Sequence, residues 1–132
     1  MYALGGHSKL LGRRVDRLNV AAPGRVTATL DAPERFRSVV PDGPEVPAVV
    51  SGRVGGATGV QRRVAIAVNG AIASTAWTLR SGQDEYYTAV LPPSTLRPGH
   101  NSVGVFAISG RGHDLRLVPL LRGEGPSFTP RP

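Results

Sequence analysis

The chain of 132 residues contains no cysteine and no long apolar run. It therefore forms no disulfide, performs no thiol chemistry and holds no cysteine-ligated zinc. Its apolar runs fall short of the ~20 residues that a helix needs to cross a bilayer, and residues 1–12 lack the apolar core of a signal peptide. The unpatterned start at residues 5–8 is typical of a piece cut from a longer protein, so membrane segments of a parent chain would lie outside it.

Lysine is almost absent, although the chain is basic. Lys9 is the only lysine among 16 Lys and Arg residues, and with 9 acidic residues the formal net charge is +7. A basic chain suits an acidic partner, but nucleic-acid binding needs clustered charge, and these arginines are mostly scattered. We therefore do not expect nucleic acid as the partner. The densest clusters, 13–17 and 62–63, are interpreted as solvated surface, with an anionic headgroup or glycan as the alternative.

Residues that carry enzyme chemistry are few and poorly placed. The three histidines, at positions 7, 100 and 113, fall in an arm and two different turns, without the spacing of metal ligands. Asp84 and Glu85 are the only adjacent carboxylates, and neighbours on a strand point to opposite faces. We therefore expect no catalytic residue, no metal and no cofactor, and predict that the domain itself is not an enzyme. An unrecognised enzyme would need carboxylates or histidines with shifted pKa values to converge in a cavity.

Short stretches of alternating apolar and polar residues, separated by Gly and Pro, dominate the rest of the chain. Such a pattern indicates half-buried strands joined by turns. Seven strands are expected, at residues 25–30, 48–54, 63–68, 71–79, 85–91, 102–109 and 114–121. With no long helical pattern, this predicts an all-β fold, an immunoglobulin-like antiparallel β-sandwich of about seven strands.

Three local features refine this fold. Asn69-Gly70 separates two strands, and this pair favours a tight hairpin turn with positive φ at both residues. The strand at 102–109 is apolar on both faces, which predicts a central strand. Trp77 and Phe106 are assigned to the core between the sheets because large rings bury much apolar area. For Trp77, stacking on a sugar is the alternative.

The N-terminal region differs from the sandwich that follows. Leu10, Leu11, Val15 and Leu18 are spaced near the helical period, and Gly12 interrupts them, so a short helical turn or an ordered arm is expected. The chain is therefore divided into an N-terminal arm or junction, a sandwich domain and a flexible tail. Their bounds are residues 1–24, 25–122 and 123–132.

Two turn motifs carry a resemblance to a known family. Val-Asn-Gly at 68–70 is followed by Leu-Pro-Pro-Ser-Thr-Leu-Arg-Pro-Gly-His-Asn at 91–101, and then by Val103 and Val105. Over roughly residues 10–121 the chain resembles the C-terminal extracytoplasmic β-sandwich domain of actinobacterial membrane-anchored sulfatase-like proteins related to phosphoglycerol transferases. The stretch 11–18 suits the junction after their catalytic domain.

This resemblance implies a noncatalytic accessory or interaction domain of a larger bacterial cell-envelope protein. It implies an extracytoplasmic location and, as partner, the catalytic domain of the parent chain or an envelope glycan. No catalytic residue of the family matches a position here. Because similar Pro-Gly-x-Asn turns occur in carbohydrate-binding sandwiches, the alternative is a carbohydrate-binding module that recognises an envelope glycan.

The candidate ligand-binding residues are basic or aromatic. They are Arg62, Arg63, Tyr86, Tyr87 and His100. The guanidinium groups could meet an anionic group, and the tyrosine rings could stack on sugars. A homodimer formed through an edge strand is a further expectation, because open sheets leave unpaired backbone donors and acceptors.

Overall fold

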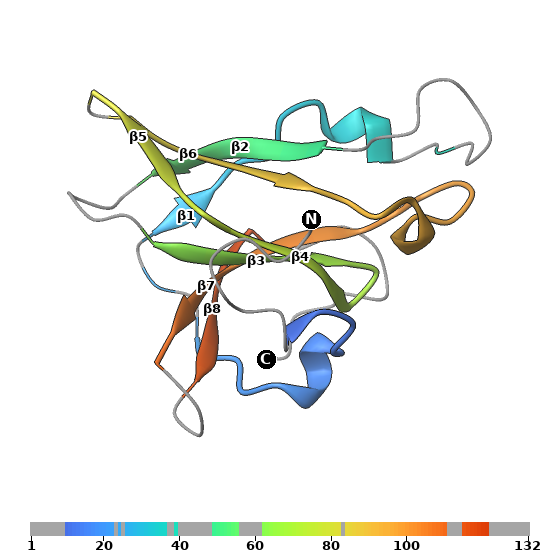
Figure 1. The fold of residues 1–132 in the computed structure, drawn as a ribbon, viewed down its shortest axis with the longest axis horizontal. Helices are drawn as coiled ribbons and strands as arrows, with labels where there is room; N and C mark the ends of the chain where they lie inside the picture. Colours follow the sequence, from blue (N-terminus) through green and yellow to red (C-terminus); the bar gives the residue numbers. More distant parts are fainter. Residues whose placement is uncertain are drawn as a thin grey trace.

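The chain folds into two antiparallel four-stranded sheets, as Figure 1 shows. The computed structural model describes residues 10–22, 24, 26–36, 39, 49–55, 62–82, 84–110 and 115–121. One sheet has the strand order β1-β2-β6-β5, and the other has the order β4-β3-β7-β8. The strands are β1 (Thr27–Ala28), β2 (Val49–Gly55), β3 (Arg63–Val68), β4 (Ala71–Trp77), β5 (Leu79–Ser81), β6 (Asp84–Val90), β7 (Val103–Ser109) and β8 (Arg116–Leu121). Three 3₁₀ turns accompany them: η2 (Val15–Arg17), η3 (Pro33–Phe36) and η4 (Pro93–Thr95).

The two sheets pack face to face around one apolar core, so the predicted β-sandwich is confirmed. The core draws alternate residues from the strands of both sheets, as expected for strands buried on one face. Its members on the strands include Val50, Val54, Val64, Ile66, Tyr87, Val105 and Leu120. The predicted tail and the histidines at positions 7 and 113 lie outside the described residues.

The Asn69-Gly70 turn and the central strand are as predicted. Asn69 has φ 53° and Gly70 has φ 85°, the positive values that a tight hairpin turn between β3 and β4 requires. Strand β7 lies between β3 and β8. Both of its faces are apolar because Val103 and Val105 face the core, whereas Phe106 and Ile108 lie in a second apolar cluster on the outer face of the sheet. No helix in the described part of the chain is long and apolar enough to cross a membrane.

The predicted strand 71–79 is in fact two strands that belong to different sheets. The chain leaves the first sheet at the end of β4 and enters the second as β5, which pairs with β6 (Figure 1). Thr78 lies at this corner and is fully buried. Its backbone N–H donates to the Arg62 carbonyl oxygen at 2.8 Å, and its Oγ1 accepts from the Arg62 N–H at 2.9 Å. Hydrophobic alternation runs through the corner unchanged, which is why the sequence did not reveal it.

Trp77 does not lie in the core, contrary to the prediction. Its side chain is 45% exposed at the end of β4. The physical reason is a β-bulge in the hairpin: Ile66 pairs with Ser74 whereas Ala67 pairs with Ile72, so Ala73 is an extra residue. One extra residue moves every following side chain to the opposite face. Trp77 therefore pairs with Arg63 and points away from the core.

Phe106 is buried, but it does not lie between the sheets as predicted. It belongs to a second cluster, on the outer face of the β4-β3-β7-β8 sheet. The cluster combines sheet residues with two residues from the start of the chain. Its members are Leu10, Val15, Ala65, Ala67, Ile72, Phe106, Ile108 and Leu117.

The expected N-terminal arm is ordered over residues 10–22 and contains the short turn η2. It crosses the outer face of the β4-β3-β7-β8 sheet, below that sheet in Figure 1. At one side it bonds to β4: the Gly12 N–H donates to the Ile72 carbonyl oxygen at 2.7 Å. At the other side it bonds to β8: the Ala21 N–H donates to the Leu117 carbonyl oxygen at 2.8 Å. The arm thus covers the apolar outer face and satisfies backbone groups on both edge strands.

Candidate functional site

The two turn motifs behind the family resemblance contact each other. The Asn69 side chain donates from Nδ2 to Asn101 Oδ1 at 2.8 Å, and its Oδ1 accepts from the Ser102 N–H at 3.0 Å. The Asn69 backbone N–H also donates to the Ser102 carbonyl oxygen at 2.9 Å. The Val-Asn-Gly and Pro-Gly-His-Asn motifs therefore form one unit at this end of the sandwich.

Asn101 holds the Pro-Gly-His-Asn turn together from within. Its side chain is 3% exposed, and its Nδ2 donates to the carbonyl oxygens of Arg97 at 2.8 Å and Gly99 at 3.2 Å. Its Oδ1 also accepts from the Arg97 N–H at 2.9 Å. A buried amide is stable only when its donors and acceptors are paired, and here they are. His100 lies exposed on the same turn.

The N-terminal arm is joined to this unit. The Val15 N–H donates to the Gly70 carbonyl oxygen at 2.8 Å, and Arg14 Nη1 donates to the Asn69 carbonyl oxygen at 3.3 Å. A Cβ added at Gly70 would lie 2.8 Å from Arg14 Nη2, so glycine also leaves room for the arm. Asn69, Gly70 and Asn101 thus have structural roles. The two motifs are therefore explained by the fold and do not by themselves indicate a ligand.

Arg62, a candidate ligand contact, is paired inside the protein. Its Nε lies 3.0 Å from Glu85 Oε2, and the Glu85 side chain is only 3% exposed. Glu85 is on the core-facing side of β6 at one end of the sandwich, and Arg62 leads into β3 of the opposite sheet. A buried carboxylate needs such a partner, so this ion pair joins the two sheets.

Tyr87, a second candidate, lies fully inside the core, so the structure gives no support to its stacking on a ligand. Its ring packs against Gly52, and its hydroxyl donates to the Thr29 carbonyl oxygen at 2.6 Å. Burial, with a smaller contribution from the charge of Asp31, raises the pKa of Tyr87 well above its usual value. The phenol is therefore a structural hydrogen-bond donor.

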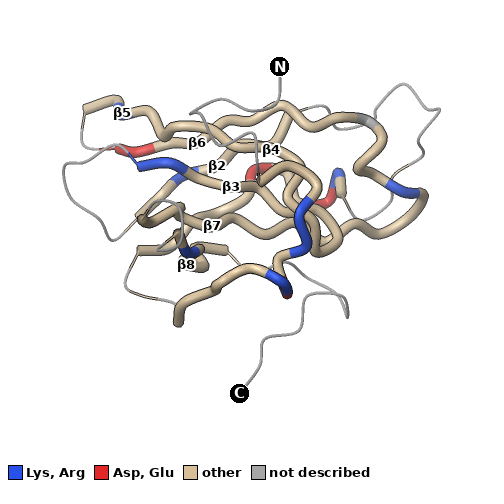
Figure 2. The backbone as a smooth tube through the Cα atoms, turned by 60° about the horizontal axis from the view of Figure 1, so that its bottom comes forward, with Lys and Arg blue, Asp and Glu red and all other residues tan. Residues whose placement is uncertain are grey.

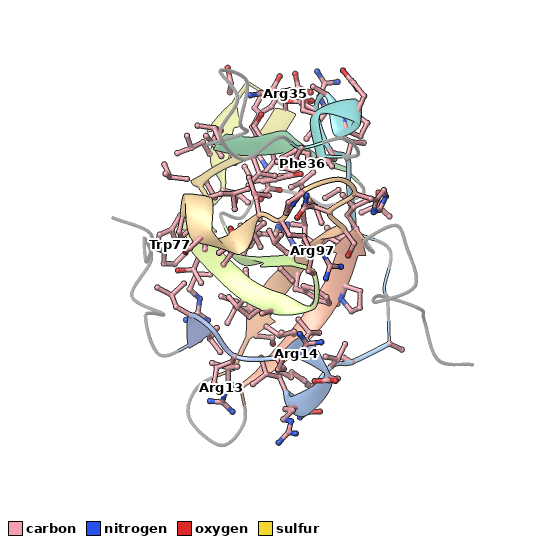
Figure 3. The ribbon with its side chains drawn as sticks, turned by 90° about the vertical axis from the view of Figure 1, so that its right-hand side faces the viewer. Arg13, Arg14, Arg35, Phe36, Trp77 and Arg97 are labelled. Carbon is pink, nitrogen blue, oxygen red and sulfur yellow. The ribbon has the colours of Figure 1, made fainter. Side chains whose placement is uncertain are left out.

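Exposed Trp77 and half-buried Arg63 form an aromatic and cationic pair. They are opposite each other on β4 and β3, and the Arg63 Cζ lies 5.9 Å from the centre of the Trp77 ring. Figure 3 shows Trp77 at the margin of the molecule, whereas Phe36 lies among other side chains. A guanidinium over an aromatic face is attracted by the ring's electrons and limits the ring's movement.

A second pair of this kind continues the same surface on the other sheet. Leu79, 58% exposed, pairs with Tyr86, which pairs in turn with Arg53. The Arg53 Cζ lies 5.5 Å from the centre of the Tyr86 ring. The Tyr86 hydroxyl donates to Asp84 Oδ2 at 3.2 Å. Because Trp77 and Leu79 flank the buried corner residue, their exposed side chains link the two pairs.

We call this surface the corner strip. It consists of Arg63, Trp77, Leu79, Tyr86 and Arg53, in that order across the corner between the sheets. Two of the five sequence candidates, Arg63 and Tyr86, lie in it. Two others, Arg62 and Tyr87, are held inside the fold, and His100 lies beyond the opposite end of β3. The sequence analysis missed Arg53 and Leu79, and the bulge hid the exposure of Trp77.

Basic positions are otherwise spread over the described backbone (Figure 2), in keeping with their scatter in the sequence. The described residues contain no group of three or more histidine, aspartate or glutamate side chains that could hold a metal ion. The chain was compared with protein-family models, with curated proteins and with solved structures, and none of them matches it.

Proposed function

We propose that this chain is a noncatalytic accessory domain of a larger bacterial cell-envelope protein, extracytoplasmic and associated with a sulfatase-like catalytic domain. The domain contributes by binding, and the corner strip is its binding surface. The observation that carries this proposal is the exposure of Trp77 and Leu79 in a strip that contains two arginine–aromatic pairs. Exposed tryptophan and tyrosine with arginine are the residues enriched where proteins bind partners.

The immunoglobulin-like form of the sandwich is part of the proposal. It is supported by the strand order, in which β1-β2-β6-β5 corresponds to the A-B-E-D sheet of immunoglobulin domains. The other sheet, β4-β3-β7-β8, corresponds to C-F-G with an added strand beside C. Domains of this architecture commonly act as binding or spacer modules, but fold alone does not assign a function.

Recognition of an envelope glycan is the second candidate function. It is favoured by the position of the two rings, which lie on the outer faces of the two sheets, each with a guanidinium group over it. Sugars stack on such rings through their apolar C–H faces. The corner strip is thus the binding surface in both candidate functions, and the two functions differ in the partner that binds to it.

Pairing of two copies through an edge strand has less support. The arm bonds to both β4 and β8, and the edge strands of the other sheet, β1 and β5, contain two and three residues. Short or covered edges are poor templates for another chain. Gel filtration over a range of protein concentrations tests this, and a stable dimer would restore the edge-strand hypothesis.

The proposed function is tested by sedimentation of the full chain with insoluble envelope material from an actinobacterium. We expect the protein to sediment with the envelope, and the Trp77→Ala variant to do so about tenfold less well, because a central aromatic contact is worth ~1.4 kcal/mol or more. Val20→Ala is the matched control, since Val20 is also an exposed apolar residue but lies beside β8. Equal binding of both variants and the parent chain would refute the role of the strip.

A further inference from the structure

We infer that the corner strip binds an acidic polysaccharide, with sugar rings on Trp77 and Tyr86 and acidic groups on Arg63 and Arg53. This inference rests on the proposed function, because it names the ligand of the same surface. It goes further in requiring both sugar rings and negative charge in one ligand.

The order of side chains along the strip suits an extended ligand. An aromatic ring with a guanidinium beside it occurs at each end, and Leu79, two residues after Trp77 in the chain, pairs with Tyr86. Neighbouring strands are ~4.8 Å apart, so the row Leu79, Tyr86 and Arg53 extends over about 10 Å of the sheet. Three successive apolar positions with a cationic group at each end match an extended polymer whose units have apolar ring faces and acid groups.

Polar side chains lie beside the strip on the sheet that contains Tyr86. On the outer face of β2 and β6, the next row beyond Arg53 and Tyr86 is formed by Ser51 and Thr88. Both hydroxyls are at least partly open to solvent and able to bond to sugar hydroxyls. The Ser51 hydroxyl donates to Asp31 Oδ2 at 3.1 Å and can still accept. Polar groups therefore adjoin the apolar strip on the side that a wide ligand would cover.

The size of the strip argues against a folded protein as the ligand. A stable protein interface buries roughly 800 Å² on each partner, with 20–30 residues a side. The strip offers three large apolar side chains, and the row next to Arg53 and Tyr86 is polar. A polysaccharide needs only a few stacked rings, because each ring adds its own contact and the next unit is already tethered nearby.

Charge selects an acidic rather than a neutral polysaccharide. Arg53 and Arg63 lie at the two ends of the strip, and Glu85, on the opposite face of β6 from Tyr86, is paired with Arg62. The strip itself contains no carboxylate; near it, Asp84 accepts from the Tyr86 hydroxyl and Asp31 accepts from the Ser51 hydroxyl. The strip is therefore cationic, and binding should weaken as salt screens these charges.

The test uses four polymers and the single tryptophan of the chain, which reports directly on the strip. Dextran sulfate and dextran share a backbone and differ in charge, polygalacturonate is a carboxylated polysaccharide, and polyglutamate is a polyanion without sugars. We expect one or both acidic polysaccharides to shift the Trp77 emission in a saturable way. Dextran and polyglutamate should bind at least about tenfold more weakly, a difference of ~1.4 kcal/mol.

Variants are compared by calorimetry with the acidic polysaccharide that binds more tightly. Trp77→Ala should weaken binding about tenfold, with Trp77→Phe closer to the parent chain, and Arg63→Gln or Arg53→Gln severalfold, because each removes one ring or one charge. Arg116→Gln, an exposed arginine on β8, is the matched control and should bind as the parent chain does. Unchanged thermal unfolding confirms that each variant is folded.

Each other outcome overturns the inference. If dextran binds as tightly as the acidic polysaccharides, negative charge on the ligand is not required. If polyglutamate binds as tightly and Trp77→Ala has no effect, the protein is attracted to polyanions in general. If neither acidic polysaccharide binds while envelope material still sediments the protein through Trp77, the ligand class is wrong and the proposed function stands. If Trp77→Ala affects neither assay, both proposals fail.

Discussion

Asn101 illustrates how a single buried polar residue can organise a whole loop. Its amide pairs with the backbone of residues 97–99 and with the Asn69 side chain, which belongs to a turn more than thirty positions earlier in the chain.

Arginine and tyrosine side chains have either structural roles or surface positions, depending on the face of the strand that they occupy. Arg62 and Tyr87 serve the interior, whereas Arg63 and Tyr86, each one residue away, lie on the outer faces of the sheets because neighbouring strand residues alternate.

Replacing Asn101 by alanine should lower the free energy of unfolding by about 3 kcal/mol. The change leaves two carbonyl oxygens, one backbone N–H and the Asn69 amide without their partner, and each unpaired buried group is costly. Urea unfolding measures the effect, and His100→Ala on the same turn is the exposed control, expected within about 0.5 kcal/mol of the parent chain. Similar values for the two variants would contradict the structural role of Asn101.

Tyr87 should make the fold sensitive to alkali. The unfolded phenol has a pKa of about 10, and burial raises the pKa of Tyr87 in the folded chain. Above pH 10 the unfolded state loses this proton while the folded state keeps it, so stability declines by up to ~1.4 kcal/mol per pH unit until the folded pKa is reached. Below pH 10 the stabilisation is fully present.

The Tyr87→Phe variant isolates this effect. Near neutral pH it should be less stable by about 1 kcal/mol, because the bond to the Thr29 carbonyl is lost. Toward pH 11 the difference should vanish, since the parent chain loses about that much to ionisation of the unfolded state. Unfolding curves of both proteins between pH 8 and 11 provide the measurement. A constant difference across this range would show that Tyr87 is not the group responsible.

The packing of the strands in this protein depends on close approach between a backbone segment and a side chain, as well as on the alternation of apolar and polar residues. Strand β2 shows it most clearly, because Gly52 lies directly opposite Tyr87 and allows the ring to reach across to Thr29. The hairpin of β3 and β4 shows the same dependence on a local irregularity. Its bulge at Ala73 changes which face Trp77 occupies, and the corner at Thr78 then delivers the chain to the other sheet.

Gly52→Ala should destabilise the fold by about 3 kcal/mol through overpacking. A Cβ at this position would collide with the Thr29 carbonyl oxygen and lie 2.7 Å from the Tyr87 ring, so backbone or ring must move. Gly55→Ala on the same strand is the matched control, because a Cβ there meets nothing within 4 Å. Thermal unfolding of the pair tests this, and equal midpoints would show that the close approach is not constraining.

The molecule as a whole has two apolar layers rather than one. The sheets enclose the first, and the second lies between the β4-β3-β7-β8 sheet and the N-terminal arm. The arm is therefore part of the folded unit over residues 10–22, in addition to any role it has as a junction. An uncovered sheet face with phenylalanine, isoleucine and leucine side chains would promote association between molecules.

A chain shortened to begin at residue 25 should lose stability and expose this outer face. Phe106, Ile108 and Leu117 would lose the cover of Leu10 and Val15. We expect a lower unfolding midpoint and strong binding of the dye ANS. Within the full chain, Val15→Ala should cost about 2 kcal/mol as a large-to-small core change, while the exposed Arg17→Ala should not. A shortened chain with the parent midpoint and no dye binding would assign the arm to a junction alone.

The sequence by itself determined the all-β class, the position of most strands, the Asn-Gly hairpin turn and the central place of β7. These follow from local rules, namely side-chain alternation, turn residues that tolerate positive φ and apolar residues on both faces of a central strand. Of the corner strip, the sequence offered Arg63 and Tyr86 as candidates, because basic and aromatic residues on strands are recognisable from their type.

Only the tertiary structure decided which side chains face solvent and which sheet each strand joins. A plain hairpin register would place Trp77 on the core side, and the single extra residue Ala73 reverses that, because side chains alternate with a period of two. The burial of Tyr87, the ion pair of Arg62 and the sheet change at Thr78 likewise depend on contacts between segments distant in the chain. Local periodicity contains no information about such contacts, so the corner strip emerged from packing alone.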